Sequence, residues 1–363
     1  MKHLRDLIVD EAPEHIDMAR CFCQVFEGNN KLKRYVFGRN NFAESISSTH
    51  AIDGFIDEFT DELTYLGKPV LRLDDIEPDA LVVSAIIGRP LTANRKLADH
   101  GYRHIDYFSF RKYAKTKPVP ARFEDCFRAE FFEHIEQYDE IFKRLADDVS
   151  KETFLKIVNF RLSSDITHLN GFTDQQSRQY FEDFLALSRS GETFADVGSF
   201  DGYTSEQFML RCPDFREVLI FEPLETNMSE IRTRLACQPR IRYFPLGLSD
   251  RKASLRFTAA GSASRLNNDG ELIVNVDCLD KIVAEPITFL KMDIEGAELA
   301  AIRGAQKLIR TYRPRLAVSV CHRVGDMREI SSLILSYCSD YRIFLRHYTE
   351  GVDETVMFFI PSS

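Results

Sequence analysis

Short apolar runs alternate with amphipathic segments in two separate parts of the chain. In the first part, residues 34–110, the runs are RYVFG, KPVLRL and ALVVSAIIG, with IDGFIDE and the helical pattern PLTANRKLADHG between them and HIDYFSF at the end. Apolar strands separated by helical patterns are typical of a parallel sheet built from βαβ units. The pattern therefore predicts a small Rossmann-like α/β domain, which we place at residues 1–115.

The hydrophobic period changes after this part. Apolar residues recur every three or four positions, which predicts helices with one apolar face: Phe123, Phe127, Phe131, Ile135, Tyr138, Phe142 and Leu145. We interpret this stripe as core or domain interface, and we expect a helical connector over residues 116–170. The preceding segment KTKPVPARF contains two prolines and is typical of a linker.

The third part, residues 171–363, has the clearer strands. A helix is expected around residues 175–188, followed by strands in TFADVG, EVLIFEP, IRYFPLGLS, ASLRFT, ELIVNV, TFLKMDIEG, RLAVSVCH, YRIFLRHY and TVMFFIP. Only TEGVDE joins the last two strands, which is too short for a helical crossover, so these strands should pair antiparallel. The expected fold is a mostly parallel α/β sheet that ends in an antiparallel hairpin.

Composition and charge restrict the class of protein. Hydrophobic residues make up 44% of the 363 positions and charged residues 28%, as in globular proteins. The net charge of −9 argues against a nucleic-acid partner, and the basic residues between positions 303 and 315 are better explained as a solvated helix face.

The cysteines and the apolar runs indicate the compartment. The eight cysteines are scattered without a CxxC pair, which favours neither a zinc site nor a disulfide framework. The N-terminal sequence MKHLRDLIVDEAPEH has no apolar signal region, and runs such as LVVSAII are too short to span a bilayer. We therefore expect a cytoplasmic protein without a membrane span.

The segment FADVGSFDGYTS has the pattern of a strand, a glycine turn and a helix. Ligands of open α/β sheets bind beyond the carboxyl ends of the strands, near the switch point of the topology. Asp196, Gly198 and Gly202 should lie there. Glu222 ends the next strand, about 20 residues later, where an acid can bind ribose hydroxyls.

The acids of this turn bear on the charge of the ligand. A dinucleotide would bring an anionic pyrophosphate, which Asp201 would repel at short range. S-adenosylmethionine (SAM) carries a sulfonium and an ammonium group, which carboxylates attract. The turn thus favours SAM over NAD, with helix capping by Asp196 or Asp201 as the alternative.

Several segments of the third part resemble the FkbM family of SAM-dependent O-methyltransferases. They are DVGSFDGYTS, LIFEPLETN, YFPLGLSD, VDCLDKI, FLKMDIEGAELAAIRGA and PRLAVSVCHR, and the resemblance extends from about residue 175 to residue 363. It implies the class I, Rossmann-like SAM methyltransferase fold for residues 171–363. It also implies methyl transfer to a hydroxyl of a sugar, glycan or related natural product.

The resemblance implies a set of site residues as well. SAM contacts are expected from Asp196, Gly198, Ser199, Asp201, Gly202, Glu222, Pro223, Asn227, Leu248, Ser249, Asp250 and Asp293. The acidic signature after the fourth sheet strand is formed by Lys291, Asp293, Glu295 and Glu298, and His322 follows the next strand.

His322 is the first candidate for the catalytic base. Its ordinary pKa of about 6.5 would leave it mostly neutral at pH 7 and able to accept a proton. A hydrogen-bonded core histidine is the alternative, and His347 is a substitute base.

Asp293 and Glu295 are two positions apart, so they point to the same side if the backbone is extended. They could orient the substrate, contact the methionine part of SAM, or bind a divalent cation together with His322. Lys291 could neutralise this acidic cluster, either within the chemistry or as a purely structural ion pair.

The first part of the chain resembles a different domain. YVFGRNNF, GFIDEF, GKPVLRLDDI and ALVVSAIIGRP are similar to the small Rossmann-like domain that precedes some sugar acyltransferases. This resemblance implies structural support or recognition of a sugar-linked substrate. The turn FGRNN holds a single glycine, which disfavours a dinucleotide, and Asp57 at the end of the second strand is the candidate contact.

Two other functions remain open at this point. The chain could be a nucleotide-sugar-binding or scaffolding protein that has lost methyltransferase activity, or an NAD-linked oxidoreductase. The glycine turn with Glu222 and the DIEGAE segment argue against the first, and the missing glycine triplet argues against the second.

Overall fold

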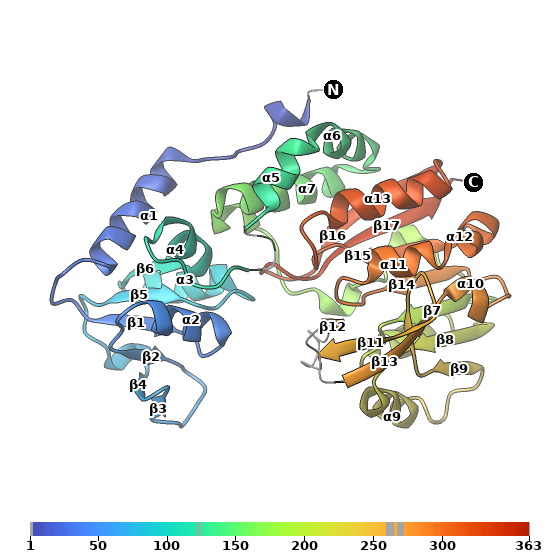
Figure 1. The fold of residues 1–363 in the computed structure, drawn as a ribbon, viewed down its shortest axis with the longest axis horizontal. Helices are drawn as coiled ribbons and strands as arrows, with labels where there is room; N and C mark the ends of the chain where they lie inside the picture. Colours follow the sequence, from blue (N-terminus) through green and yellow to red (C-terminus); the bar gives the residue numbers. More distant parts are fainter. Residues whose placement is uncertain (1–2, 122, 124, 259–264, 267–271, 363) are drawn as a thin grey trace. The chain divides into compact units, whose positions relative to one another are not determined.

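The computed structural model describes residues 3–121, 123, 125–258, 265–266 and 272–362. The chain divides into two compact units (Figure 1). Unit 1 comprises residues 1–135, 152–174 and 348–353, and unit 2 comprises residues 136–151, 175–347 and 354–363. Neither unit is one continuous stretch of sequence.

Unit 1 is built on a six-stranded sheet with the order β3-β4-β2-β1-β5-β6. Its strands are β1 (Arg34–Phe37), β2 (Gly54–Ile56), β3 (Thr64–Tyr65), β4 (Lys68–Leu71), β5 (Leu81–Ser84) and β6 (Arg103–Asp106). Neighbouring strands pair parallel except β3 and β4, which form an antiparallel hairpin. The parallel sheet expected from the sequence is therefore confirmed.

The helices η1 (Leu4–Asp6) and α1 (Pro13–Phe26) precede β1, and α4 (Tyr107–Tyr113) follows β6. The helices between the strands are α2 (Asn41–Thr49), η2 (Leu73–Asp75) and α3 (Pro90–Asp99). Their starts follow local chemistry. The Asn40 side chain caps α2, Pro90 occupies the first turn of α3, and the Asp106 side chain caps α4.

The helical segment that follows contains α5 (Phe127–Glu133), α6 (Ile135–Arg144) and α7 (Asp148–Ser163), then η3 (Ile166–Leu169). All seven residues of the predicted apolar stripe are buried, which confirms their place in the core. The two units divide this segment, since residues 136–151 group with unit 2 and residues 152–174 with unit 1.

Unit 2 is built on a seven-stranded sheet with the order β16-β17-β15-β14-β7-β8-β9. Its strands are β7 (Thr193–Val197), β8 (Glu217–Phe221), β9 (Ile241–Phe244), β14 (Phe289–Met292), β15 (Arg315–Ser319), β16 (Tyr341–His347) and β17 (Thr355–Pro361). β17 pairs antiparallel with both β15 and β16, and the other pairs are parallel. The predicted terminal hairpin is thus confirmed, together with the doubly wound, Rossmann-like arrangement.

Unit 2 also contains the helices α8 (Tyr203–Arg211), α9 (Glu225–Arg234), α10 (Leu279–Ile282), α11 (Glu298–Arg303), α12 (Gln306–Tyr312) and α13 (Asp326–Tyr337), in addition to most of α6. A second, four-stranded sheet has the order β10-β13-β11-β12 and contains β10 (Gly247–Leu248), β11 (Ala253–Thr258), β12 (Arg265–Leu266) and β13 (Leu272–Asp277). Within the described residues, every helix is too short or too polar to serve as a membrane span.

The prediction of a helix around residues 175–188 is wrong. This segment forms only the 3₁₀ turns η4 (Gln176–Arg178) and η5 (Asp183–Leu185). Tyr180 and Ala186 have positive φ angles of 69° and 46°, which an α-helix does not contain. Aromatic packing holds the segment instead, because the Phe184 ring stacks on Phe344 with a centroid distance of 4.1 Å.

Candidate functional site

The predicted site residues follow the carboxyl ends of neighbouring strands in unit 2. β7 is flanked by β8 on one side and by β14 on the other, so the chain direction switches beside β7. Gly198 follows β7 with φ of 76°, and a Cβ atom there would lie 1.9 Å from the carbonyl oxygen of Asp293. Only glycine permits this approach, which brings the turn after β7 against the loop after β14.

Asp196 lies on β7, directly before this turn, and is fully buried. Its Oδ2 accepts hydrogen bonds from the hydroxyls of Ser199 at 2.9 Å and Ser205 at 2.7 Å. Its Oδ1 lies 3.2 Å from Lys291 Nζ. Asp196 therefore organises the turn from within and does not reach its surface.

Asp201 pairs with Arg234, whereas Asp196 pairs with Lys291. The Asp201 carboxylate pairs with Arg234 at 2.8 Å and accepts a hydrogen bond from the Tyr203 N–H at 3.0 Å. The capping alternative thus describes Asp201 better than direct attraction of a ligand does. The charge argument for SAM drawn from Asp201 is corrected accordingly, because Arg234 already neutralises this acid. Gly202 has φ of 83° and begins α8 beside Ile231.

Glu222 connects the turn after β7 to the end of β8. Its Oε2 accepts a hydrogen bond from the Phe200 N–H at 3.1 Å, and its Oε1 accepts from the Leu224 N–H at 3.0 Å and from Asn227 Nδ2 at 3.3 Å. Burial raises the pKa of Glu222, although these hydrogen bonds act in the opposite direction. The predicted pair of Glu222 and Asn227 is brought together.

Leu248 ends β10 of the smaller sheet, and Ser249 directly follows it. Both are buried, and the Ser249 N–H donates to the carbonyl of Asp277 at 2.9 Å. A Cβ atom on the preceding Gly247 would lie 4.0 Å from Pro223, so β10 runs close to the end of β8.

Lys291 projects from β14 beneath the glycine turn. Its Nζ donates to the carbonyl of Gly198 at 2.5 Å, in addition to its ion pair with Asp196, and lies 5.2 Å from the centre of the Tyr180 ring. The Lys291 side chain is 3% exposed, which leaves it no access to a substrate. The structural interpretation of Lys291 fits this geometry better than direct chemistry does.

Asp293 is the more accessible acid of the group, with a quarter of its side chain exposed. It accepts a hydrogen bond from the Tyr180 hydroxyl at 2.6 Å. Burial would raise the pKa of Asp293, but His322 and Lys291 outweigh burial and lower it. Burial and Asp293 raise the pKa of Tyr180 well above its usual value, so the phenol stays protonated and donates.

His322 lies among three carboxylates. Its Nδ1 is 2.9 Å from Glu298 Oε1, and its Nε2 is 3.3 Å from Asp293 Oδ1 and 3.7 Å from Glu295 Oε1. Burial would lower the pKa of His322, but Cys321 and Glu298 outweigh it and raise the pKa well above its usual range. The expectation of a mostly neutral histidine at pH 7 is therefore wrong for this environment.

The loop after β14 delivers these acids by an unexpected backbone path. Glu295 has φ of 56°, so the segment is not extended as the two-residue spacing assumed, yet Asp293 and Glu295 still face the same imidazole. Glu298 is 1% exposed and accepts a hydrogen bond from the Ile294 N–H at 2.9 Å. It does more than favour a helix terminus, because it also fixes His322.

Asp293, Glu295 and His322 could hold a cation. One ligand atom each from Asp293, Glu295 and His322 lies within 4.8 Å of the others. Carboxylate oxygens suit a hard divalent ion such as Mg²⁺.

Two participants were missed from the sequence. Tyr180 lies 113 positions before Asp293, inside a segment expected to be helical, and no local pattern marks it. Ser205 lies in the segment FADVGSFDGYTS itself, and its Oγ donates to Asp196 Oδ2.

Comparisons with known proteins bear on the family and the fold of the chain. Residues 196–349 match the family model described as the methyltransferase FkbM domain. No curated protein sequence matches the chain. Among solved structures, the FkbM methyltransferase from Methylobacillus flagellatus KT is similar with a TM-score of 0.77 and 24% identity over 94% of this chain and 93% of that chain. At this identity the likeness shows the fold alone.

Smaller methyltransferases match part of the chain. SMU.1697c from Streptococcus mutans, solved with S-adenosylhomocysteine (SAH), is 14% identical over 49% of this chain and 93% of that chain, with a TM-score of 0.31. The fibrillarin of Aeropyrum pernix is 13% identical over 48% of this chain and 69% of that chain, also with a TM-score of 0.31. The family match covers residues 196–349, and this part of the chain is similar to the methyltransferase domain of the FkbM family.

Proposed function

We propose that this protein transfers the methyl group of SAM to a hydroxyl of a sugar, glycan or related natural product. The observation that carries the proposal is the contact between Gly198 and the Asp293 carbonyl, which places the glycine turn beside His322 and its acids. A cofactor on the turn and an acceptor at His322 would then be neighbours.

The residues present suit SAM. Glu222 Oε2 accepts one hydrogen bond within the protein, and a carboxylate oxygen can accept two, which leaves capacity for a ribose hydroxyl. Asp293 and Glu295 are partly exposed acids, so they supply the negative charge that favours a cation. SAM, when bound, supplies an electrophilic methyl carbon on a positively charged sulfur.

The residues of the chain would align and deprotonate the acceptor. Methyl transfer is an in-line displacement: the oxygen–carbon bond forms as the carbon–sulfur bond breaks, and sulfur keeps the electron pair. The acceptor loses its hydroxyl proton, which His322 Nε2 would receive. Glu298 would hold the Nδ1 proton and so fix the tautomer in which Nε2 is the accepting atom.

Asp293 is suited to orienting the acceptor rather than to taking its proton. Its lowered pKa keeps it ionised and makes it a weak base. Tyr180 fixes one of its oxygens, and the other lies near His322 Nε2, where it can accept a hydrogen bond from a second hydroxyl of the acceptor, next to the one that is methylated.

The proposal is tested by binding and by transfer. Calorimetry should detect SAH binding, and methyl-tritiated SAM should label hydroxyl compounds in a panel of monosaccharides, nucleotide sugars and oligosaccharides. The His322→Asn variant should bind SAH as the wild type does and lose label transfer. Absence of SAH binding would overturn the methyltransferase assignment, and transfer to amines alone would overturn the hydroxyl acceptor.

A further inference from the structure

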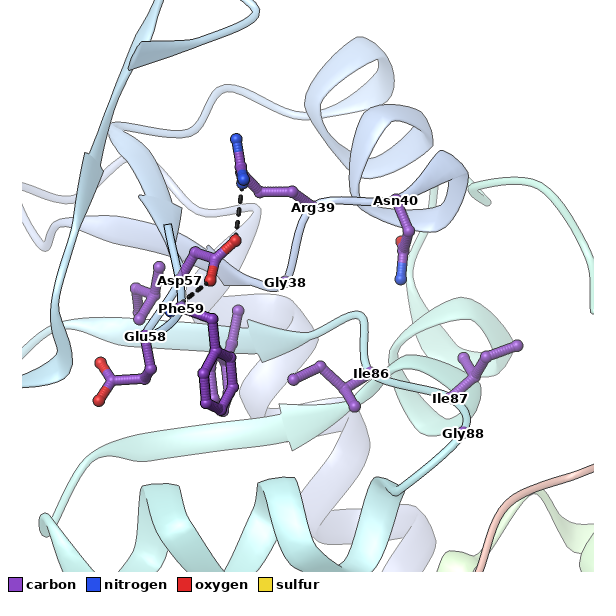
Figure 2. A pocket seen from close by; sticks show the side chains of 11 residues that line it. Gly38, Arg39, Asn40, Asp57, Glu58, Phe59, Ile86, Ile87 and Gly88 are labelled. Carbon is purple, nitrogen blue, oxygen red and sulfur yellow. Dashed lines mark hydrogen bonds and ion pairs between the residues drawn. The ribbon is translucent and has the colours of Figure 1, made fainter. Parts of the chain in front are cut away.

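Unit 1 contains a pocket with a volume of about 260 Å³ at the carboxyl ends of β1, β2 and β5 (Figure 2). β1 lies between β2 and β5 in the sheet, so the strand order switches from one side of β1 to the other at this point. Open α/β sheets bind ligands in this position, outside the strand ends at the switch point. The methyltransferase domain lies in the other part of the chain and leaves this pocket without a function.

One side of the pocket is apolar. Phe59 lies on the loop after β2 and is 96% exposed, and no ring among the described residues stacks against it. Ile86 follows β5, and its side chain points toward the loop that carries Asp57 (Figure 2). Phe37 and Ile56 close the base of the pocket as buried strand residues. An exposed aromatic ring beside apolar side chains offers a surface for a planar base.

The other side is polar and centred on Asp57. Its Oδ2 pairs with Arg39 Nε at 2.7 Å, and its Oδ1 accepts a hydrogen bond from the Phe59 N–H at 2.8 Å. Each oxygen can accept one more hydrogen bond. Burial would raise the pKa of Asp57, but the Phe59 N–H and Arg39 outweigh burial and lower it, so the side chain is an ionised acceptor for hydroxyl groups.

The neighbouring acid, Glu58, also has one partner on each of its oxygens. Glu58 pairs with Lys96 at 2.9 Å and accepts a hydrogen bond from the Leu73 N–H at 2.9 Å. Figure 2 shows the Glu58 carboxylate pointing away from Ile86, so we assign ligand recognition to Asp57. It directly follows the second strand of the sheet, where an acid binds ribose hydroxyls in this architecture.

The turn after β1 is not arranged around a phosphate. Gly38 is its single glycine, with φ of 109°, and a Cβ atom there would lie 3.2 Å from Ile86 Cγ1. The Asn40 side chain already accepts hydrogen bonds from the N–H groups of Phe42 and Ala43 at the start of α2. Those donors would otherwise face an anion, so phosphate contributes little to binding here.

We propose that this pocket binds the nucleoside part of a nucleotide, with the base against Phe59 and Ile86 and the ribose hydroxyls donating to Asp57. The pocket volume of about 260 Å³ lies just below the range of about 300–1,000 Å³ that is usual for pockets of drug-sized ligands. A volume at this lower end suits a ligand as small as a nucleoside. A dinucleotide would need more space and a phosphate-binding turn.

Calorimetry on the full chain tests the proposal with adenosine, guanosine, uridine and cytidine, their 2′-deoxy forms and their 5′-diphosphates. At least one ribonucleoside should bind saturably, and its diphosphate should bind within about tenfold of it. Asp57→Asn and Phe59→Ala should each weaken binding at least tenfold, and the 2′-deoxy form should bind the wild type more weakly. Phe59 is exposed and Asn can keep the hydrogen bond from the Phe59 N–H, so both variants should fold normally.

Matched variants separate this pocket from other sites. Asp74→Asn and Met18→Ala change an exposed acid and an exposed apolar residue of unit 1 away from the pocket and should leave the affinity unchanged. Glu222→Gln alters the candidate SAM site in unit 2, and it should also leave the nucleoside affinity of the unit 1 pocket unchanged. The proposal is overturned if no nucleoside binds at 10 mM, if Asp57→Asn and Phe59→Ala bind as the wild type does, or if the diphosphates bind more than a hundredfold tighter than the nucleosides.

Discussion

His322 Nδ1 lies 2.9 Å from Glu298 Oε1, and this contact fixes which nitrogen of the imidazole faces the acids after β14. The same Glu298 oxygen accepts the hydrogen bond from the Ile294 N–H, so the loop and the histidine share one anchor. The His322 ring thus lies between the buried Glu298 carboxylate at Nδ1 and the partly exposed Asp293 carboxylate at Nε2. This arrangement is suited to moving a proton at Nε2.

The pH dependence of methyl transfer should report this contact. The base must be unprotonated, and the pKa of His322 is raised, so kcat/KM should increase as the pH rises through a value above 6.5. Glu298→Gln removes a negative charge beside the ring, so the pKa should fall and the rise should move to lower pH. His322→Asn should lower kcat by about 10²–10⁴-fold and abolish the rise.

His100→Asn, a change at a histidine of unit 1, serves as the control and should keep the wild-type profile. An unchanged pH midpoint in Glu298→Gln would contradict the positioning role of this residue. If dialysis against EDTA abolishes activity and Mg²⁺ restores it, Asp293, Glu295 and His322 hold a cation and His322 is not the base.

Glu222→Gln should weaken SAH binding at least tenfold, which corresponds to about 1.4 kcal/mol. Every group that contacts the Glu222 carboxylate is a donor: the N–H groups of Phe200 and Leu224 and the Asn227 amide. A glutamine would turn an NH₂ group toward one of these donors, which disturbs the turn and removes an acceptor for the ribose.

Glu225→Gln is the matched control for calorimetry with SAH. Glu225 is an exposed acid at the start of α9, three positions after Glu222, and it pairs with Arg232 at 3.0 Å. Equal SAH affinities for Glu222→Gln and Glu225→Gln would remove Glu222 from the cofactor site.

The strands and their order could be predicted because buried parallel strands appear in the sequence as continuous apolar runs. β7 is buried at all five positions, and the segment TFADVG shows it directly. The terminal hairpin followed from a connection too short for a crossover, and β16 and β17 pair over seven residues.

The roles of the charged residues could not be predicted, because their partners are distant in sequence. Asp201 pairs with Arg234 after 33 positions, and Lys291 pairs with Asp196 across two strands. A pattern of carboxylates indicates a site, but the pairing that neutralises each of them depends on the tertiary fold. The pKa of His322 depends on the fold for a related reason, because burial and Glu298, which lies 24 positions earlier, contribute to it together with the adjacent Cys321.

Gly198→Ala should destabilise unit 2 severely. The φ of 76° costs a residue with a Cβ atom about 1–2 kcal/mol, and the clash with the Asp293 carbonyl adds to this. We expect a loss of about 3 kcal/mol or more in urea denaturation, at the upper end for single substitutions. Gly191→Ala is the matched control, with φ of 79° and no atom within 4 Å of the new Cβ, and it should lose only the conformational part. Equal losses in both variants would show that the contact with Asp293 is not tight.

Asp147 should make unit 2 sensitive to acid. Its carboxylate lies 2.6 Å from Arg346 on β16, and burial is outweighed by the hydrogen bonds from Arg346 and Ser150, which lower the pKa of Asp147 to about 2. A lowered pKa stabilises the folded state fully above the unfolded value near 3.9, and this stabilisation is lost as the pH falls toward 2. After allowance for solvent screening it amounts to about 1–2 kcal/mol.

Asp147→Asn keeps the cap on Ser150 and removes the charge, so its melting temperature should lie below that of the wild type at pH 7 and approach it between pH 4 and pH 2. The exposed neighbour Asp148→Asn should show a smaller difference, and a gap for Asp147→Asn that persists unchanged at pH 2 would contradict the ion pair.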